Sequence, residues 1–553
     1  MKFVCLAAAG LVSFALLAQA ATAAGAGPAA GDTAAGELIY LRGISAAGPI
    51  AGVREPGGMR SQGRDVACVN CHLHSGLGMT EGHTYVPPIT GRYLFQPRAS
   101  DHKQPDLPYV EGMHRDRDPY TDATLARAIR EGVDSEGKPL GNLMPRFDLN
   151  DQEMTSLIAY LKKIGAARVP GVTDTVLHFA TIVTPDADPI KRDGMLAVMR
   201  TYFDDRNTRV LRTLPTMHTS ENTMYSKTMY MVNRRWQLHV WTLAGPAGTW
   251  QGQLEKYMAK EPVFAVLSGI GGSNWAPVRR FCERERVPCL FPNVEVPVAE
   301  DDDFYSLYLS KGVLLESELV AKVLLEAPPE HSIKSVRQIY RAGDSGEAAA
   351  RALADALAGS NLKVHNHVVG ASKSGETVAG AIAGTSADEV LVLWLRPADI
   401  AELGPLPERV DRVYLSGIMG GLEHAPLPPG WRKKTWLAYP FDLPDKRVVR
   451  VDYSLGWFRI RHIPVVAEQV QADTYLACGL LAETLSHMVD TFERDYLIER
   501  VNENLEHRIM TGYYPRLSLA LGQRFASKGG YVIRFDDVEG NRLAADSQPW
   551  MVP

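Results

Sequence analysis

The pattern of apolar and polar residues changes near residue 170 of this 553-residue chain. Before that point, short amphipathic patterns predict helices at 36–43, 123–131 and 150–164. Long polar or Gly- and Pro-rich loops, including 45–65, join these helices. We therefore expect a small all-α unit with long loops at residues 36–166.

The larger region, residues 171–553, alternates apolar runs typical of strands with helical patterns, which favours parallel sheets and an α/β architecture. Because about 380 residues exceed what one core usually holds, we expect two lobes. Strands are predicted at 177–183, 237–243, 263–267, 288–292, 335–340, 364–369, 389–394 and 412–414. Helices are predicted at 191–203, 252–258, 313–325, 346–357 and 473–492, with a further helix that ends at 285.

The first residues are typical of a secretory signal peptide. A short positive start is followed by an apolar run from Phe3 to Ala18 and by small-x-small cleavage sites, which predicts a signal at 1–24 and a linker at 25–35. The run is too short to span a bilayer, so we expect export to the periplasm with no stable membrane span after cleavage. A net charge of -5 and a pI near 6.3 give no reason to expect nucleic acid as a partner.

The segment Cys68-Val-Asn-Cys71-His72 has the C-x-x-C-H spacing of covalent haem c attachment. Two thiols at this spacing can each form a thioether to one porphyrin, and the adjacent imidazole of His72 is then placed to bind the iron. The alternatives are a zinc knuckle, a disulfide or a redox dithiol. Zinc would require a second Cys/His pair at ligand spacing, and a dithiol would require a βαβ context.

The second iron ligand should lie far from His72 in sequence. Met144 precedes Pro145 in a loop between the later two helices, and its soft thioether suits iron. A pair of His ligands or an open iron site are the alternatives. Rival side chains are Met79, Met113, His74, His83 and His114.

These motifs and the segment Val86–Gly91 occur in the order found in class I cytochrome c domains, and residues 36–165 resemble such a domain. The resemblance implies one haem c, with His72 and Met144 as axial ligands of the haem iron. It also implies that a carbonyl near Pro87 or Pro88 accepts the His72 Nδ1 proton. Such a domain transfers electrons and performs no bond chemistry of its own, so no enzymatic activity is expected.

In the α/β region, the turn Leu267–Asn274 is rich in glycine and serine and follows a predicted strand. Its glycines would let backbone N–H groups approach a carboxylate at the start of a helix. A plain strand-to-helix turn is the alternative. The candidate ligand-binding residues for a small polar or anionic solute are Ser268, Gly271, Gly272, Ser273 and Asn274.

This turn, together with Ala342–Gly346 and Tyr439–Asp442, resembles the type I periplasmic substrate-binding fold of branched-chain amino acid receptors of ABC transporters. The tail Arg516–Arg524 resembles that of substrate-binding proteins encoded with quinoprotein alcohol dehydrogenase systems. One departure is Thr184–Asp188, which stands where the family has a Gly-rich opening.

Six cysteines are present, and Cys5 would leave with the signal peptide. Cys282 and Cys289 could join in a disulfide or be two small buried residues, and an oxidising compartment permits either. Cys478 lies in an apolar helical pattern and is expected in the core.

Two functions follow from these motifs. The first is a periplasmic mono-haem cytochrome in electron transfer, fused to a solute-binding receptor-like domain, with a quinoprotein dehydrogenase or another cytochrome as redox partner. The alternative is a solute-binding protein of an ABC-type uptake or sensing system in which the haem domain is a docking or redox-sensing accessory.

Overall fold

A computed structural model describes most of the chain, which forms two compact units. The first unit contains Met1–Cys68 and Tyr120–Lys163, and the second contains Val69–Pro119 and Ile164–Pro553. The predicted signal peptide, most of the linker, Met113, His83 and His114 lie outside the described residues. The described ranges are 31–55, 57–81, 84–95, 117–217, 234–326, 333–370, 377–488, 491–520, 522–536, 540–544 and 549–553.

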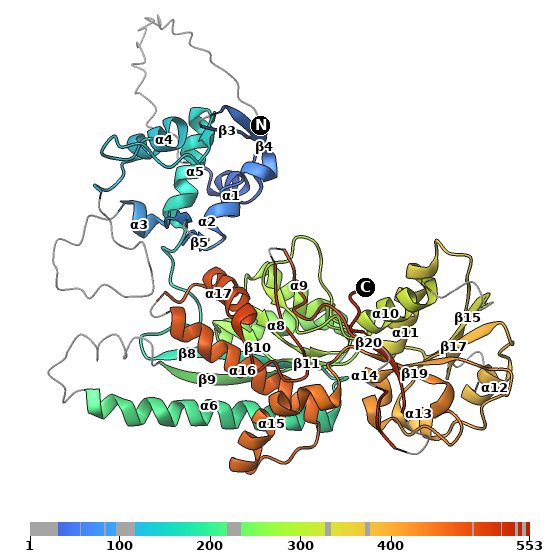
Figure 1. The fold of residues 1–553 in the computed structure, drawn as a ribbon. Helices are drawn as coiled ribbons and strands as arrows, with labels where there is room; N and C mark the ends of the chain where they lie inside the picture. The colour runs from blue at the N-terminus through green and yellow to red at the C-terminus, as the bar shows by residue number, and fades with distance from the viewer. Residues whose placement is uncertain are drawn as a thin grey trace, which may run out of the picture. The chain divides into compact units, whose positions relative to one another are not determined.

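The first unit contains the three predicted helices together with short strands (Figure 1). Gly43 ends the first helix in a left-handed conformation, as the sequence pattern predicts, while Asp32 caps its start three residues before the predicted one. The expectation of an all-α unit is wrong, because part of the segment predicted as a loop at 45–65 forms strands. Strand β3 pairs with both β4 and β7. The elements are α1 (Thr33–Arg42), β1 (Ile44–Ser45), β2 (Gly48–Pro49), β3 (Ala51–Arg54), β4 (Met59–Gln62), α4 (Asp122–Glu131), β7 (Arg146–Phe147) and α5 (Asp151–Lys163).

Residues 69–95 belong to the second unit, where they contact α17 (Arg494–His507). The buried Glu499 carboxylate accepts hydrogen bonds from the Ser75 backbone N–H at 2.9 Å and from the Ser75 hydroxyl at 2.5 Å. The His74 ring stacks on Phe304 with the ring centroids 3.8 Å apart. The segment contains α2 (Val69–His72), β5 (Met79–Glu81), β6 (Thr84–Val86) and α3 (Gly91–Phe95).

The first lobe of the second unit is built on a seven-stranded sheet in which every pairing is parallel. Strand β8 lies between β9 on one side and β10 and β11 on the other. The strands are β8 (Val176–Val183), β9 (Arg235–Thr242), β10 (Ala265–Leu267), β11 (Ile270–Gly271), β12 (Cys289–Leu290), β13 (Asn293–Val294) and β14 (Ser306–Leu307). The helices are α6 (Pro189–Met217), α8 (Trp250–Lys260), α9 (Ala276–Arg284), α15 (Pro444–Ile460), α16 (Glu468–Met488) and α17.

The second lobe has a six-stranded sheet in the order β16-β15-β17-β18-β19-β20, and only its last pairing is antiparallel among the described strands. The strands are β15 (Ser335–Arg341), β16 (Lys363–Val369), β17 (Glu389–Trp394), β18 (Val413–Ser416), β19 (Thr435–Tyr439) and β20 (Tyr531–Arg534). The helices are α10 (Val313–Leu325), α11 (Ser345–Leu357), α12 (Val378–Ala383), α13 (Pro397–Ala401) and α14 (Gly417–Gly420).

The chain passes between the two lobes at three places. It leaves the first sheet after β14 for α10, which packs on β19 and β20, and it returns after β19 to α15, which packs on α16. It passes across again after Phe525, which pairs with Tyr308 beside β14, and enters β20. In each sheet the first strand lies between the second and the third, so each sheet has a topological switch point at the carboxyl ends of its strands.

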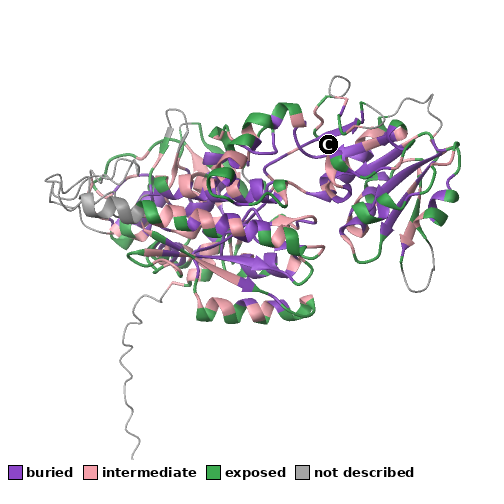
Figure 2. Cartoon of the chain, turned by 90° about the horizontal axis from the view of Figure 1, so that it is seen from below, coloured by how far each residue is buried: buried purple, intermediate pink, exposed green. Residues whose placement is uncertain are grey.

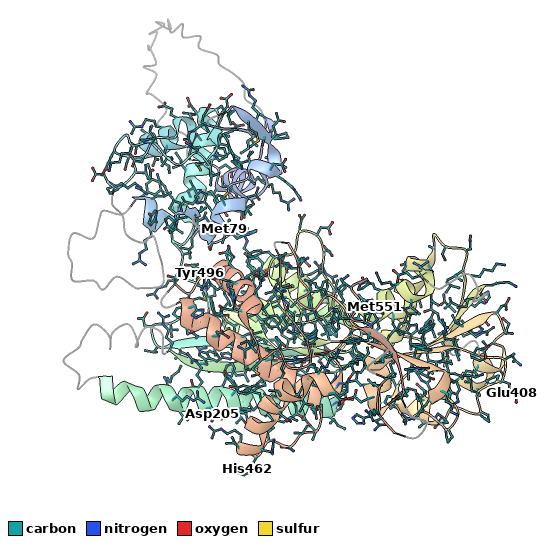
Figure 3. The ribbon with its side chains drawn as sticks, viewed as in Figure 1. Met79, Asp205, Glu408, His462, Tyr496 and Met551 are labelled. Carbon is teal, nitrogen blue, oxygen red and sulfur yellow. The ribbon has the colours of Figure 1, made fainter. Side chains whose placement is uncertain are left out.

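Apolar burial explains why both lobes are stable (Figure 2). Strand β17 is buried at every position, and the apolar run that follows its first residue, Glu389, is typical of a central parallel strand. Helix α15 is held on α6 by polar contacts to Asp205, which accepts from Trp457 at 3.3 Å and pairs with Arg461 at 2.7 Å (Figure 3). Among the described residues, no helix is long and apolar enough to cross a membrane.

Candidate functional site

A cavity of about 930 Å³ lies between the two lobes, at the carboxyl ends of both sheets. Open α/β sheets bind ligands at this position, because the loops diverge there and leave a crevice. Most residues that line the cavity lie at or just after the carboxyl ends of strands, namely β8, β11, β13, β14, β17, β18 and β19. The other lining residues lie at the start of α16, together with Tyr513 and Tyr514.

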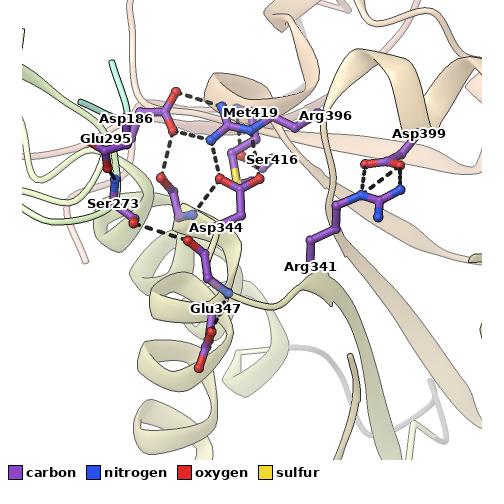
Figure 4. A network of polar contacts seen from close by, with 12 residues as sticks. Asp186, Ser273, Glu295, Arg341, Asp344, Glu347, Arg396, Asp399, Ser416 and Met419 are labelled. Carbon is purple, nitrogen blue, oxygen red and sulfur yellow. Dashed lines mark hydrogen bonds and ion pairs between the residues drawn. The ribbon is translucent and has the colours of Figure 1, made fainter. Parts of the chain in front are cut away.

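A group of charged side chains joins the two lobes at one side of this cavity, and we call it the interlobe ion cluster (Figure 4). Glu295 of the first lobe accepts hydrogen bonds from Arg396 of the second lobe at 2.8 and 2.6 Å. It also accepts from the Ser345 hydroxyl at 2.8 Å, and Lys191 approaches it at 3.1 Å. Asp344 completes the cluster by accepting from Arg396 Nε at 2.9 Å.

The electrostatics of the cluster keep its members charged. Burial alone would raise the pKa of Glu295, but the hydrogen bonds and charge of Arg396, the charge of Lys191 and the Ser345 hydrogen bond together lower it to about 2. Burial would lower the pKa of Arg396, but its two carboxylate partners raise it. The cluster therefore joins the lobes through paired charges, among which the Glu295 carboxylate is the most buried.

The Gly-rich turn departs from its expected role in three of its five residues. Gly271 and Gly272 line the cavity as predicted. Ser268 is fully buried and hydrogen-bonds Thr474 at 3.2 Å, while Asn274 is exposed. A ligand-binding role for the five residues stays a prediction.

The backbone N–H of Ser273 donates to Asp186 Oδ2 at 3.1 Å, so the chain's own carboxylate accepts the hydrogen bond that was expected to hold a solute carboxylate. Asp186 lies in Thr184–Asp188, the segment that replaces the Gly-rich opening of the resembled family. The Ser273 hydroxyl donates to the Gly343 carbonyl of the other lobe at 3.2 Å. The turn thus serves contacts within the protein more than a ligand.

The opposite side of the cavity combines aromatic rings with carboxylates. Phe441, Tyr513 and Tyr514 line it, and the Phe441 centroid lies 5.5 Å from each tyrosine ring. Tyr513 donates to Glu468 at 2.5 Å, and Tyr514 donates to Asp473 Oδ2 at 3.0 Å.

Asp473 combines nearly complete burial with an unsatisfied oxygen. Its residue exposure is 4%, and its Oδ1 has no hydrogen-bond partner. Burial raises the pKa of Asp473 to about 7, although hydrogen bonds from Tyr514 and Gln469 act in the opposite direction. The sequence prediction missed this residue because it lies in an apolar helical pattern.

Glu423 is the third carboxylate near these rings. It accepts from Arg447 at 3.0 Å and from the Tyr439 hydroxyl at 2.7 Å, so its charge is compensated inside the protein. Arg447 lies over the Tyr513 ring, 4.1 Å from its centroid. This network fixes the rings that face the cavity.

The predicted haem motif lies on α2 and immediately before it. His72 is buried, and its Nδ1 lies 3.0 Å from the Pro87 carbonyl oxygen, as the cytochrome resemblance implies. Because a carbonyl can only accept, Nδ1 carries the proton and the lone pair is on Nε2. Burial lowers the pKa of His72 to about 4, which favours the neutral imidazole. A neutral, oriented imidazole beside Cys71 suits iron ligation, so these residues fit a covalent haem.

Met144 lies in the first unit, two residues before β7. Strand β7 pairs with β3. Pro145 is buried against Gly52, and the Met144 carbonyl accepts from Arg146 at 2.5 Å. His72 belongs to the other unit, so the pairing of His72 and Met144 as axial ligands stays a prediction.

The two cysteines considered for a disulfide are unbridged. Cys282 and Cys289 are buried, and their thiols share a hydrogen bond. That hydrogen bond and burial both raise the pKa of Cys282. Cys478 is buried in α16, as expected.

Together these features define a two-lobed α/β protein with a cavity between its lobes. No family model and no curated protein matches the chain. Solved structures with a similar fold include the isoleucine-bound branched-chain amino acid transporter substrate-binding protein of Streptococcus pneumoniae. It has a TM-score of 0.46 and 10% identity, over 68% of this chain and 100% of that chain.

Two further structures are similar over 70% and 66% of the chain. A fatty acid ABC transporter substrate-binding protein from Thermomonospora curvata has a TM-score of 0.44 and 13% identity, over 70% of this chain and 94% of its own. A branched-chain amino acid ABC transporter protein from Rhodospirillum rubrum has a TM-score of 0.43 and 17% identity, over 66% and 100%. Since these identities and TM-scores are low, the function of this chain is inferred from its own cavity.

Proposed function

We propose that this chain is a periplasmic solute receptor, of the kind that serves ABC-type uptake or sensing, and that its ligand binds in the cavity between the lobes. One observation carries this proposal: a cavity of about 930 Å³ lies at the switch points of the two α/β sheets. A cavity of this size suits a small organic molecule. The exported location is a proposal from the signal-peptide pattern.

The three crossings between lobes provide the hinge for such a receptor. Only short connections join β14 to α10 and β19 to α15, so the lobes can rotate while their cores stay intact. The interlobe ion cluster stabilises the closed arrangement, and a solute that contacts both lobes would add to that stabilisation.

A thermal-shift screen of the full-length protein tests the receptor function. A solute that binds only the folded form stabilises it, by about 2.7 kcal/mol at a hundredfold excess over the dissociation constant. The matched control is Ala467→Trp, which places a bulky ring among the residues that line the cavity. We expect at least one compound to raise the melting temperature of the wild type and not of Ala467→Trp. Equal shifts in both proteins would place the binding site elsewhere, and no shift in a broad screen would contradict the receptor function.

A second function is supported by the His72 arrangement. We propose that Cys68 and Cys71 attach one haem c, that His72 binds its iron and that Met144 is the other axial ligand. The group would supply one-electron transfer, with a quinoprotein dehydrogenase or another cytochrome as the redox partner. Pro87 would hold the His72 ring in the orientation that ligation needs.

Expression with a c-type haem maturation system tests this second function. We expect a haem that survives denaturation in the wild type and is absent from the Cys68→Ala/Cys71→Ala variant. Purified alcohol dehydrogenase with its substrate should then reduce the haem. A colourless wild-type protein would contradict haem attachment without affecting the receptor proposal.

A further inference from the structure

The charges that line the cavity do not suit an anionic solute. Among the described lining residues, the two permanent cations are Lys191 and Arg396, and both already pair with Glu295. A solute carboxylate would therefore have to compete with a buried internal carboxylate for these cations. Such exchange is unfavourable, because it would leave Glu295 desolvated and uncompensated.

The carboxylates of the lining outnumber its cations, and most of them have partners within the chain. Asp186 and Asp188 accept from nearby backbone N–H groups. Glu423 pairs with Arg447, and Glu468 accepts from Tyr513. Asp473 differs, because its Oδ1 is buried and has no hydrogen-bond partner.

A buried carboxylate oxygen without a donor carries a free-energy cost. At 4% exposure, Asp473 receives little compensation from solvent. An N–H donor with a positive charge is the group that compensates such an oxygen best, since charge-assisted hydrogen bonds are the stronger kind. The raised pKa of Asp473 agrees with a carboxylate that lacks its cationic partner.

The rings around Asp473 favour the same chemistry. Tyr514 contacts the carboxylate directly, and Phe441 and Tyr513 line the cavity beside it. Aromatic faces attract cations electrostatically, and their apolar surface accommodates the carbon skeleton of an organic amine.

We propose that the cavity binds an organic solute with a protonated amine, and that the carboxylate of Asp473, which lines the cavity, pairs with the ammonium group. This inference rests on the proposed receptor function and replaces the carboxylate-bearing solute expected from the Gly-rich turn. Asp473 is then a specificity residue for the ligand.

Binding of matched compounds to the full-length protein tests the proposal. The probes are benzylamine, putrescine and ethanolamine, each compared with the alcohol and the carboxylate of the same carbon skeleton. The variant is Asp473→Asn, which keeps the shape of the side chain and removes its charge. The matched control is Asp452→Asn, which removes the same charge from an exposed position of α15 outside the cavity.

We expect amines to bind the wild type and Asp452→Asn alike, and to bind Asp473→Asn at least about 30-fold more weakly. Calorimetry in two buffers of different ionisation enthalpy gives a second readout that needs no variant. Near pH 7, a cation beside Asp473 should lower its pKa and release protons as it binds.

The alternative results separate the two proposals. If alcohols or carboxylates bind and amines do not, the receptor function stands and the amine inference is overturned. Equal amine affinity in Asp473→Asn and the wild type, with no proton release, also overturns it. If none of the compounds in this panel or in the broad screen binds, the receptor function fails and the inference fails with it.

Discussion

Replacing Arg396 by alanine should open the cavity, because Arg396 is the main contact of the second lobe with the Glu295 carboxylate. Glu295 would keep Lys191 and the Ser345 hydroxyl but would lose both guanidinium hydrogen bonds. Its side chain is only 14% exposed, so solvent would compensate little of the loss in the closed arrangement. In an open arrangement, water would replace the missing partner.

The magnitude follows from the burial of the pair. Removing one partner of a buried ion pair typically costs about 3–5 kcal/mol. Because the Arg396 side chain is 31% exposed and Lys191 and Ser345 remain, we expect less, about 2 kcal/mol, which shifts the closed-to-open ratio roughly thirtyfold. The control is Arg341→Ala. Arg341 pairs with Asp399 inside the second lobe, so its loss can lower the stability of that lobe but should leave the closed-to-open ratio unchanged.

Small-angle X-ray scattering and hydrogen exchange measure the effect. We expect Arg396→Ala to increase the radius of gyration and to speed exchange in the segments that connect β14 to α10 and β19 to α15. Arg341→Ala should leave both quantities unchanged. Equal behaviour of the two variants would refute the claim that Glu295 and Arg396 hold the lobes together.

The same cluster predicts a pH dependence with a defined sign. The pKa of Glu295 is about 2, below its ordinary value of about 4.3. A lowered carboxylate pKa contributes stability that is fully present above the ordinary value and is lost as the pH falls toward 2. The closed arrangement should therefore weaken progressively below about pH 4.3 in the wild type, and this part of the pH dependence should be much smaller in Glu295→Gln. Scattering curves of the two proteins across this range should differ if the assignment is correct.

Three further predictions concern the rest of the chain. Ser75→Ala removes a hydroxyl donor from the buried Glu499, so the free energy of unfolding in urea should fall by about 1–3 kcal/mol, and no change would contradict the contact. In protein that carries haem, Met144→Ala should abolish the weak sulfur-to-iron absorption band and leave the haem attached, while a retained band would exclude Met144 as a ligand. Gly171→Ala should destabilise the second unit by at least about 2 kcal/mol in urea unfolding, because Gly171 has φ +82° and an added Cβ would lie 2.1 Å from the Phe264 nitrogen. Wild-type stability of this last variant would contradict the described backbone.

Much of the fold was predictable because strands and helices with strong apolar patterns dominate both sheets. Every predicted strand overlaps a strand of the structure, and α10 has the predicted bounds 313–325. The sequence prediction missed β14 because it has only two residues, and it missed β20 because that strand is a short apolar run near the chain end. Helices α15 and α17 were missed because charged side chains interrupt their apolar patterns. In α15 one of these, Arg447, is buried among polar partners.

The strands at 51–54 and 59–62 were missed for another reason. Their sequences, Ala-Gly-Val-Arg and Met-Arg-Ser-Gln, show no clear alternation, and residues 45–65 are rich in glycine and proline. Pairing with each other and with β7, which is distant in sequence, supplies their hydrogen bonds. These two strands are therefore determined by tertiary pairing and not by local propensity.

The site was less predictable than the fold. Glycines and serines at 267–274 gave a visible signal, and two of these residues line the cavity. Glu295 and Arg396 are 101 positions apart, and only the fold brings them together. The position of Arg396 in the site could have been predicted, because this residue closely follows the buried strand β17. Side chains at the carboxyl ends of parallel strands meet at the switch point.

A crystal structure of the full-length protein with the strongest compound from the solute screen tests the central claim most directly. The account predicts one solute molecule enclosed between the lobes, in contact with the rings of Phe441 and Tyr514 and with Asp473, while Arg396 remains paired with Glu295. A solute bound outside this cavity, or a cavity that stays empty while the same compound raises the melting temperature, would contradict it.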